Sequence, residues 1–340
     1  MINLAQNEVK RICQTLLCQE SAVSFSQDEV GAVSLYDRSF FPWKGLPYPL
    51  EHAKLALLLH QLGYTEVAKK MAVWQRATLD HAKHPIYSFF LQEKGCSYDA
   101  LKQANLDFFN VMGEQPAFEN PFVHNHLGIV NFQKPGTTIL CAATGCKSGM
   151  GVFYNEDAGI INYGPSLTEM WDCTGFGLAG RAHKFLYEKT TEGFDLSYHV
   201  RLAAPHPRET GFATLQDSGF SGLWMNCKQS LLGNALDTSC SFEGIGALSA
   251  LTFSLFGKGR VCIVAKSHRL APRSLDRYEG PCQIIEFEGD LGKVSVEPKD
   301  GIDQMQVIPL AGDESFWGAD FLISFKMKSF PIQFSFNLSN

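Results

Sequence analysis

The sequence predicts an α+β protein in which N-terminal helical hairpins precede a large antiparallel β-sandwich. Up to about residue 115, apolar residues recur at three- and four-residue spacing, which is typical of amphipathic helices. After about residue 120 they gather in short runs separated by Gly, Pro, Asn and Asp, which is typical of strands. Phe (26 residues) and Gly (30 residues) are both frequent, and this composition also favours strands and turns.

Length and composition are consistent with two folded parts. The chain has 340 residues, of which 45% are hydrophobic and 19% are charged, so it can bury a sizeable core. We place a helical domain of a truncated α/α type at 1–115 and an antiparallel β-sandwich domain at 120–340. The net charge is −6 without a long run of either sign, which excludes a basic footprint for nucleic acid.

The helices of the first part are predicted from their apolar faces and end signals. They cover 3–19, 50–62, about 65–80 and about 97–110. We expect Gly63 to end the second of them, Thr65 to act as the N-cap of the third, and Ser97 to begin the last. In the third helix, Val67, Met71 and Trp74 line one face.

The strands of the second part are predicted from apolar runs bounded by turn residues. Phe334 and Phe336 alternate with Ser335 and Asn337, which is the period-two pattern of a half-buried strand. The other runs are TTILCAA, GVFY, AGIINYG, FDLSYHVRLA, SGLWMNC, LSALTFSLFG, RVCIVAKS, QIIEFEG, KVSVEP, MQVIPL and FLISFKM. Their regular spacing suits antiparallel strands in a sandwich.

Two histidines, His124 and His126, lie close together at the start of the β part. In a strand they would project from one face, with Asn125 on the other. That geometry suits two ligands of one zinc ion, and zinc is the only cofactor that the sequence indicates. Further ligands would come from His183, His199, His206, Asp172 or Cys173. The alternatives are a pair of catalytic bases or a polar strand edge.

The most Gly-dense segment, 143–180, contains neither a P-loop nor a nucleophile elbow. We interpret it as tight turns and bulges between strands. The functional alternative is a loop cluster that approaches a ligand closely and exposes Tyr163, Trp171, Asp172 and Arg181. Aromatic rings, carboxylates and Arg are the groups that a sugar-binding surface uses.

At the start of the β part, His124-Asn125-His126 is followed by Asn131-Phe132, by Thr138-Ile139-Leu140-Cys141 and by Gly145. This order resembles the start of the β domain in the heparinase II/III-like polysaccharide lyases. The outline of helices followed by a β domain is also similar. The resemblance implies a sugar-polymer cleft between the domains, with His124 or His126 at the cleft or on a structural metal. The chain departs from the family in its short helical part and in having Gly128 and Ile129 where an acidic residue is usual.

Three functional hypotheses follow. The first is a carbohydrate-active protein, either an enzyme or an inactive relative of one. Its catalytic candidates are His124, His126, Tyr163 and Arg181, and its substrate-binding candidates are Trp171, Asp172 and Asn125. The second is a non-catalytic β-sandwich module that binds a glycan or a protein, and the third is a protein-interaction or effector protein.

The expected partners are therefore a polysaccharide or other glycan, or a protein. No apolar stretch is long enough for a membrane span, and the N-terminus lacks the apolar core of a signal peptide. We therefore expect a cytoplasmic protein, with unconventional secretion as the alternative. The ten cysteines contain no CxxC pair and are interpreted as reduced, mostly buried residues.

Overall fold

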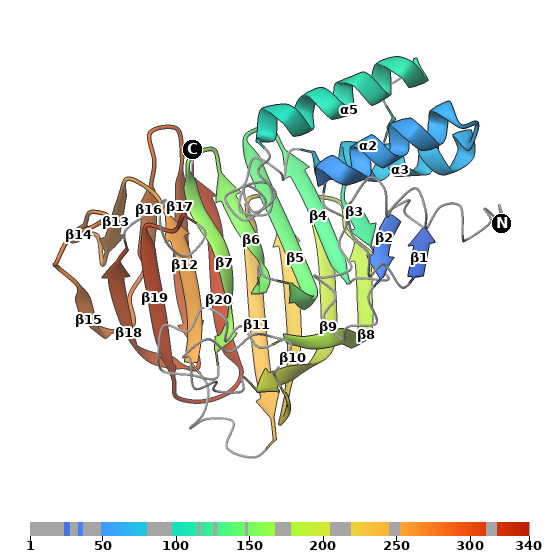
Figure 1. Ribbon diagram of the computed structural model, residues 1–340. Coiled ribbons are helices and arrows are strands. Elements are labelled where there is room, and N and C mark those ends of the chain that lie inside the picture. Colours follow the sequence, from blue (N-terminus) through green and yellow to red (C-terminus); the bar gives the residue numbers. More distant parts are fainter. Residues whose placement is uncertain are drawn as a thin grey trace, which may run out of the picture. The chain divides into compact units, whose positions relative to one another are not determined.

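The computed structural model describes residues 24–27, 33–36, 49–79, 97–113, 116–117, 119–124, 128–146, 149–166, 178–204, 219–244, 252–310 and 318–339 (Figure 1). The chain divides into two compact units, Met1–His126 and Leu127–Asn340. The predicted helix at 3–19 lies outside the described residues.

The first unit contains three helices and short strands. The helices are α2 (Pro49–Gln61), α3 (Thr65–Thr78) and α5 (Tyr98–Met112), and the strands are β1 (Ser24–Gln27), β2 (Val33–Tyr36) and β3 (Phe122–His124). Strands β1 and β2 pair antiparallel. The three helices share a core whose fully buried members include Leu59, Met71 and Phe108. Val67 and Trp74 are also buried, as predicted for this face of α3.

Local signals set the helix ends. Gly63 adopts a left-handed φ of 87°, and its N–H donates to the carbonyl oxygen of His60, so the chain leaves α2 there. The Ser97 hydroxyl accepts from the N–H of Ala100 and caps α5. The predictions for Gly63 and Ser97 are thus confirmed. The prediction for Thr65 is wrong, because Tyr64 is the N-cap of α3 and makes no side-chain capping bond.

The second unit is mostly β and resembles a sandwich of two antiparallel sheets. One sheet has the order β14-β13-β16-β17-β20-β11-β10-β9-β8. Its strands are β8 (Leu178–Lys189), β9 (Gly193–Ala204), β10 (Gly219–Leu232), β11 (Ala235–Glu243), β13 (Val261–Val264), β14 (His268–Leu270), β16 (Ile285–Glu288), β17 (Lys293–Asp300) and β20 (Ile332–Ser339). We call it the first sheet.

In the second sheet, the strands of this unit follow the order β15-β18-β19-β12-β7-β6-β5-β4. They are β4 (Ile129–Lys134), β5 (Thr137–Cys146), β6 (Gly149–Asn155), β7 (Ala158–Ser166), β12 (Thr252–Lys258), β15 (Tyr278–Pro281), β18 (Ile302–Pro309) and β19 (Phe321–Met327). Every apolar run named from the sequence overlaps a strand of one of the two sheets, although the first four residues of LSALTFSLFG lie outside the described part of the chain.

Aromatic side chains fill the space between the two sheets. The Phe336 ring on β20 lies 5.1 Å from the Tyr163 ring on β7 and 5.9 Å from the Phe153 ring on β6, measured between centroids. The Phe334 ring lies 4.8 Å from that of Phe253 on β12. All five rings are at most 1% exposed. The high Phe content therefore supplies the core of the sandwich.

Within the described residues, no helix is long and apolar enough to cross a membrane.

Candidate functional site

The outer face of the first sheet is polar along β9, β10 and β11. Residues alternate in and out along a strand, and the inward-facing set on β10 is buried: Leu223, Met225, Cys227, Gln229 and Leu231. The outward-facing set on the same strand is partly or fully exposed: Trp224, Asn226, Lys228 and Ser230. The strand registers extend these positions sideways into rows that cross the sheet.

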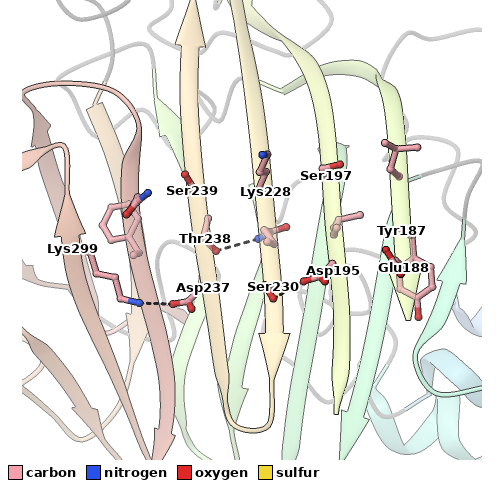
Figure 2. A pocket seen from close by; sticks show the side chains of 15 residues that line it. Tyr187, Glu188, Asp195, Ser197, Lys228, Ser230, Asp237, Thr238, Ser239 and Lys299 are labelled. Atoms are coloured by element: carbon pink, nitrogen blue, oxygen red, sulfur yellow. Dashed lines mark hydrogen bonds and ion pairs between the residues drawn. The ribbon is translucent and has the colours of Figure 1, made fainter. Parts of the chain in front are cut away.

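Two neighbouring rows enclose a hollow of about 750 Å³, which we call the polar trough (Figure 2). One row pairs Ser230 with Asp195 on β9 and with Asp237 on β11, and the other pairs Lys228 with Ser197 and Ser239 on the same two strands. Because serine side chains are short, the middle of the face is hollow between longer side chains. Those longer side chains include Glu188 on β8 and Lys299 on β17.

The two carboxylates of the trough are held by hydrogen bonds. The Ser230 hydroxyl donates to Oδ1 of Asp195 at 2.5 Å. Oδ1 of Asp237 accepts from the Lys299 ammonium at 2.7 Å and from the Ser335 hydroxyl at 2.5 Å. Oδ2 of Asp195 and Oδ2 of Asp237 make no hydrogen bond to a described residue, so each carboxylate keeps an open acceptor.

Asp237 is kept in its ionised form. Partial burial raises the pKa of this carboxyl group, but the hydrogen bonds from Lys299 and Ser335 and the positive charge of Lys299 outweigh that effect. The pKa of Asp237 therefore lies below its ordinary value. At neutral pH Asp237 can accept hydrogen bonds but cannot donate a proton.

Lys228 contributes a positive charge to the trough. It is exposed, and its ammonium forms no hydrogen bond or ion pair with any residue in the described part of the chain. Its register partners, Ser197 and Ser239, place a hydroxyl on either side. By contrast, Lys299 is paired with Asp237. Lys228 can therefore donate to a ligand without first breaking an internal ion pair.

The floor of the trough is anchored in the core of the sandwich. Gln229 and Thr238 line the trough, yet their side chains are only 2% exposed. The Gln229 side-chain amide donates to the Tyr163 hydroxyl oxygen at 2.7 Å, which links the first sheet to β7 of the second. Burial, together with the nearby thiols of Cys141 and Cys227, raises the pKa of Tyr163 well above its usual range.

Beside the trough, an aromatic group occupies the next two rows of the same face. The rings of Trp224 and His199 lie 4.7 Å apart with a 30° tilt, and the Arg201 guanidinium lies 5.8 Å from the centre of a Trp224 ring. The Asn226 side chain donates to Oε1 of Glu243. Trp224 pairs in register with both Arg201 and Glu243.

Most site residues predicted from the sequence cannot be placed in these rows. His124 is the last residue of β3, and Arg181 lies within β8, but their side chains are outside the described part of the chain. Asn125, His126, Trp171 and Asp172 lie wholly outside it. The loop-cluster alternative, in which Tyr163 would be exposed, is wrong for this residue, because its side chain is 0% exposed. Its catalytic role stays an untested prediction.

The described cysteines are free and largely buried, as predicted. Cys141, Cys227, Cys240 and Cys262 are buried, and Cys282 is half-buried. Among the described residues, no group of three or more His, Cys, Asp or Glu side chains is arranged to hold a metal ion. The zinc prediction for His124 and His126 is untested, because those side chains are not described.

The trough residues themselves were not predicted as a site. The usable signal in the sequence was a partial alternation of polar and apolar residues over 224–231 and 235–243, which Gln229 and Thr238 interrupt. It identifies an outward polar face on each strand. The alternation does not show that the polar faces of the two strands lie side by side. The site exists only because they do.

No protein-family model matches the chain, and no curated protein matches its sequence. Solved structures that it resembles include a 4-α-glucanotransferase from Thermococcus litoralis, with a TM-score of 0.36 and 8% identity over 86% of this chain and 49% of that one. This chain therefore spans about half the length of the glucanotransferase.

Two further solved structures are similar to most of the chain. The Slr1438 protein of Synechocystis sp. PCC 6803 has a TM-score of 0.34 and 8% identity over 66% of this chain and 99% of its own. A galactose mutarotase related enzyme from Lactobacillus acidophilus has a TM-score of 0.31 and 10% identity over 62% of this chain and 97% of its own. Likeness at this level assigns neither a family nor an activity to the chain.

Proposed function

We propose that the polar trough is a carbohydrate-binding site and that the protein recognises a glycan. The observation that carries this proposal is the set of open hydrogen-bonding groups on one sheet face. It comprises an acceptor on Asp195, an acceptor on Asp237 and the donors of Lys228. They lie on three adjacent strands, so a ligand in the trough can reach all of them.

The chemistry of these groups matches a polyhydroxylated ligand. A sugar hydroxyl donates one hydrogen bond and accepts others, so it can pair with a carboxylate and with an ammonium group. Hydrogen bonds to charged partners are stronger than neutral ones. The internal bonds of Asp195 and Asp237 hold both carboxylates in place before a ligand arrives, which reduces the entropy lost on binding.

The trough is less suited to a nucleic acid or a protein than to a glycan. Two carboxylates among its central residues would repel the negatively charged phosphates of a nucleic acid. Protein interfaces usually centre on buried aromatic or Arg anchors, whereas the trough centres on serines and short acidic side chains. Leu186, 65% exposed, is its main apolar rim residue. A glycan is therefore favoured over a nucleic acid or a protein.

We assign binding, and no reaction step, to the trough. Asp237 is held as a carboxylate by Lys299 and Ser335, so it does not supply the proton of a general acid. The proposed catalytic roles of His124, His126, Tyr163 and Arg181, and the substrate contacts of Asn125, Trp171 and Asp172, stay predictions. So do a zinc ion on the two histidines and a likeness to the heparinase II/III-like lyases.

The first test is to screen the full chain on a glycan array with neutral, uronate-containing and amino-sugar members, and then to titrate the retained glycans by calorimetry. We expect Asp195→Asn to weaken binding about tenfold or more, because it removes a charged acceptor. Glu279→Gln on β15 is the matched control and should leave affinity unchanged, because this exposed carboxylate lies on the other sheet.

The proposal is contradicted if the array retains no glycan. It is also contradicted if Asp195→Asn binds as tightly as the unmodified chain. Circular dichroism and the melting temperature of each variant should match those of the unmodified protein, so that a change in affinity reports on the trough and not on folding.

A further inference from the structure

The aromatic group beside the trough continues the same face of the same strands. On β10, every second position of this face is occupied in turn by Trp224, Asn226, Lys228 and Ser230. Successive outward positions on a strand are about 7 Å apart, so the Trp224 row lies about 13 Å from the Lys228 row and about 20 Å from the Ser230 row. One sugar ring in the trough cannot span that distance, but a chain of several rings can.

The Trp224 row offers a different kind of contact from the trough. The indole is partly exposed, and an aromatic ring presents a flat apolar surface on which the C–H face of a sugar ring can stack. His199 packs against the Trp224 ring at 4.7 Å, and Arg201 lies over it at 5.8 Å, so the indole is braced by both. The orientation of Trp224 is thus set without a ligand.

Charged groups flank this ring on the neighbouring strands. Arg201 on β9 and Glu243 on β11 are the register partners of Trp224. Glu243 is exposed and accepts from Asn226, so its carboxylate is oriented in the same way as the trough carboxylates. The row therefore combines a stacking surface with a forked donor on one side and an acceptor on the other.

We propose that Trp224, Arg201 and Glu243 form a second sugar subsite and that the ligand is a linear oligosaccharide lying along β10 from the trough to Trp224. This inference rests on the proposed glycan-binding function and extends it. The trough determines which glycan binds, through charged hydrogen bonds. The Trp224 subsite makes the affinity depend on chain length.

The test is a chain-length titration of the full chain with malto-, cello- and galacturonate oligosaccharides, each from the monosaccharide to the hexasaccharide. Affinity is expected to rise with length and to level off once the oligosaccharide reaches Trp224. Trp224→Ala should weaken hexasaccharide binding about tenfold and leave disaccharide binding unchanged. Trp224→Tyr, which keeps an aromatic ring, should recover most of the loss.

Two comparison variants separate this inference from the proposed function. Asp195→Asn should weaken the disaccharide and the hexasaccharide alike, because both occupy the trough. Tyr278→Ala removes a half-buried aromatic ring from β15 of the other sheet and should change neither affinity. A purely structural role for Trp224 would lower the melting temperature without producing a difference between short and long ligands.

A loss confined to long ligands in Trp224→Ala supports the second subsite. Equal losses for short and long ligands, or no loss for the hexasaccharide, overturn it, while the effect of Asp195→Asn would still uphold the trough. If no oligosaccharide of any length binds the unmodified protein, both the subsite and the proposed function fail.

Discussion

The hydroxyl of Tyr163 joins the two sheets beneath the polar trough. It accepts a hydrogen bond from Gln229, a residue of the trough floor, inside a core of Phe side chains. The other acceptor near the Gln229 amide nitrogen is the Thr238 hydroxyl, which lies farther away, at 3.5 Å. The Gln229 Oε1 has no hydrogen-bond partner in the part of the chain that the structure describes. The Tyr163 hydroxyl is therefore a structural group that positions the floor.

Tyr163→Phe is expected to lower the free energy of unfolding by about 1–3 kcal/mol, because it leaves the buried amide of Gln229 without a good acceptor. Phe fills nearly the same volume, so packing is kept. Urea unfolding followed by circular dichroism gives the difference. In a double-mutant cycle with Gln229→Leu, the two effects should be strongly non-additive, and additive effects would show that the bond contributes nothing.

His52 on α2 of the first unit is a buried imidazole. It is 2% exposed, its Nδ1 lies 3.1 Å from the Gln75 amide nitrogen, and its ring lies 4.6 Å from that of Trp74. Burial lowers the pKa of His52 to about 3. The folded helices therefore hold this side chain neutral at physiological pH.

Acidification should therefore destabilise the helices through His52. An unfolded chain protonates this residue near its ordinary pKa of about 6.5, whereas the folded chain resists protonation until about 3. Above the unfolded pKa, His52 does not lower the free energy of unfolding. As the pH falls from the unfolded pKa to the folded pKa, the free energy of unfolding decreases by up to about 1.4 kcal/mol per pH unit. Urea unfolding at a series of pH values measures this slope.

His52→Leu removes the titrating group and should flatten the pH dependence over that range. Gln75→Leu keeps the buried imidazole and should retain the dependence, even though it lowers stability at every pH. If His52→Leu has the same slope as the unmodified protein, then the burial of His52 does not control the acid sensitivity of the helices.

At the scale of elements, two strands that form the site, β9 and β10, are predicted from their apolar runs, whereas the third, β11, has a weaker apolar signal. The strands of the core, such as β7, β12 and β19, are nearly continuous apolar runs and are predicted directly. In β11, the buried residues Leu236, Thr238, Cys240 and Phe242 alternate with polar ones, and β11 was not predicted. A strand whose outward face serves a ligand carries polar residues there, which interrupts the run by which strands are recognised.

The Gly-dense segment shows how an irregular element can be predicted in kind but not in detail. In the described part of this segment the interpretation as turns and bulges is confirmed, because the register shifts between Cys141 and Cys146 and again between Gly149 and Phe153. Residues 147–148 and 167–177 lie outside the described part. Gly151 has a φ of 149°, and a Cβ there would lie 1.9 Å from the Leu140 carbonyl oxygen. Only glycine permits this close approach of two strands.

At the scale of the whole molecule, the proposed ligand-binding face belongs entirely to the second unit. All the residues of the polar trough and of the Trp224 row lie between 186 and 335. The first unit has its own helical core. The two units are separate in the chain, with the division after His126.

A fragment of residues 127–340 is therefore expected to bind the same glycans as the full chain, with the same affinity. Calorimetric titration of both proteins checks this, and the circular dichroism of the fragment must show β structure for the comparison to count. A folded fragment that binds more weakly would show that the first unit contributes to recognition.

The sequence by itself determined the kinds of most elements: the helices α2, α3 and α5, a mostly β remainder after about residue 120, the helix ends at Gly63 and Ser97, and the strands with strong apolar runs. It did not predict the strands β1 and β2 of the first part. These features depend on neighbouring residues, through periodicity, capping and turn chemistry. Only the tertiary structure decided that Tyr163 is internal and that Asp195, Lys228 and Asp237 share one face. Strand order and register bring these residues together, and neither is encoded in the spacing along a single strand.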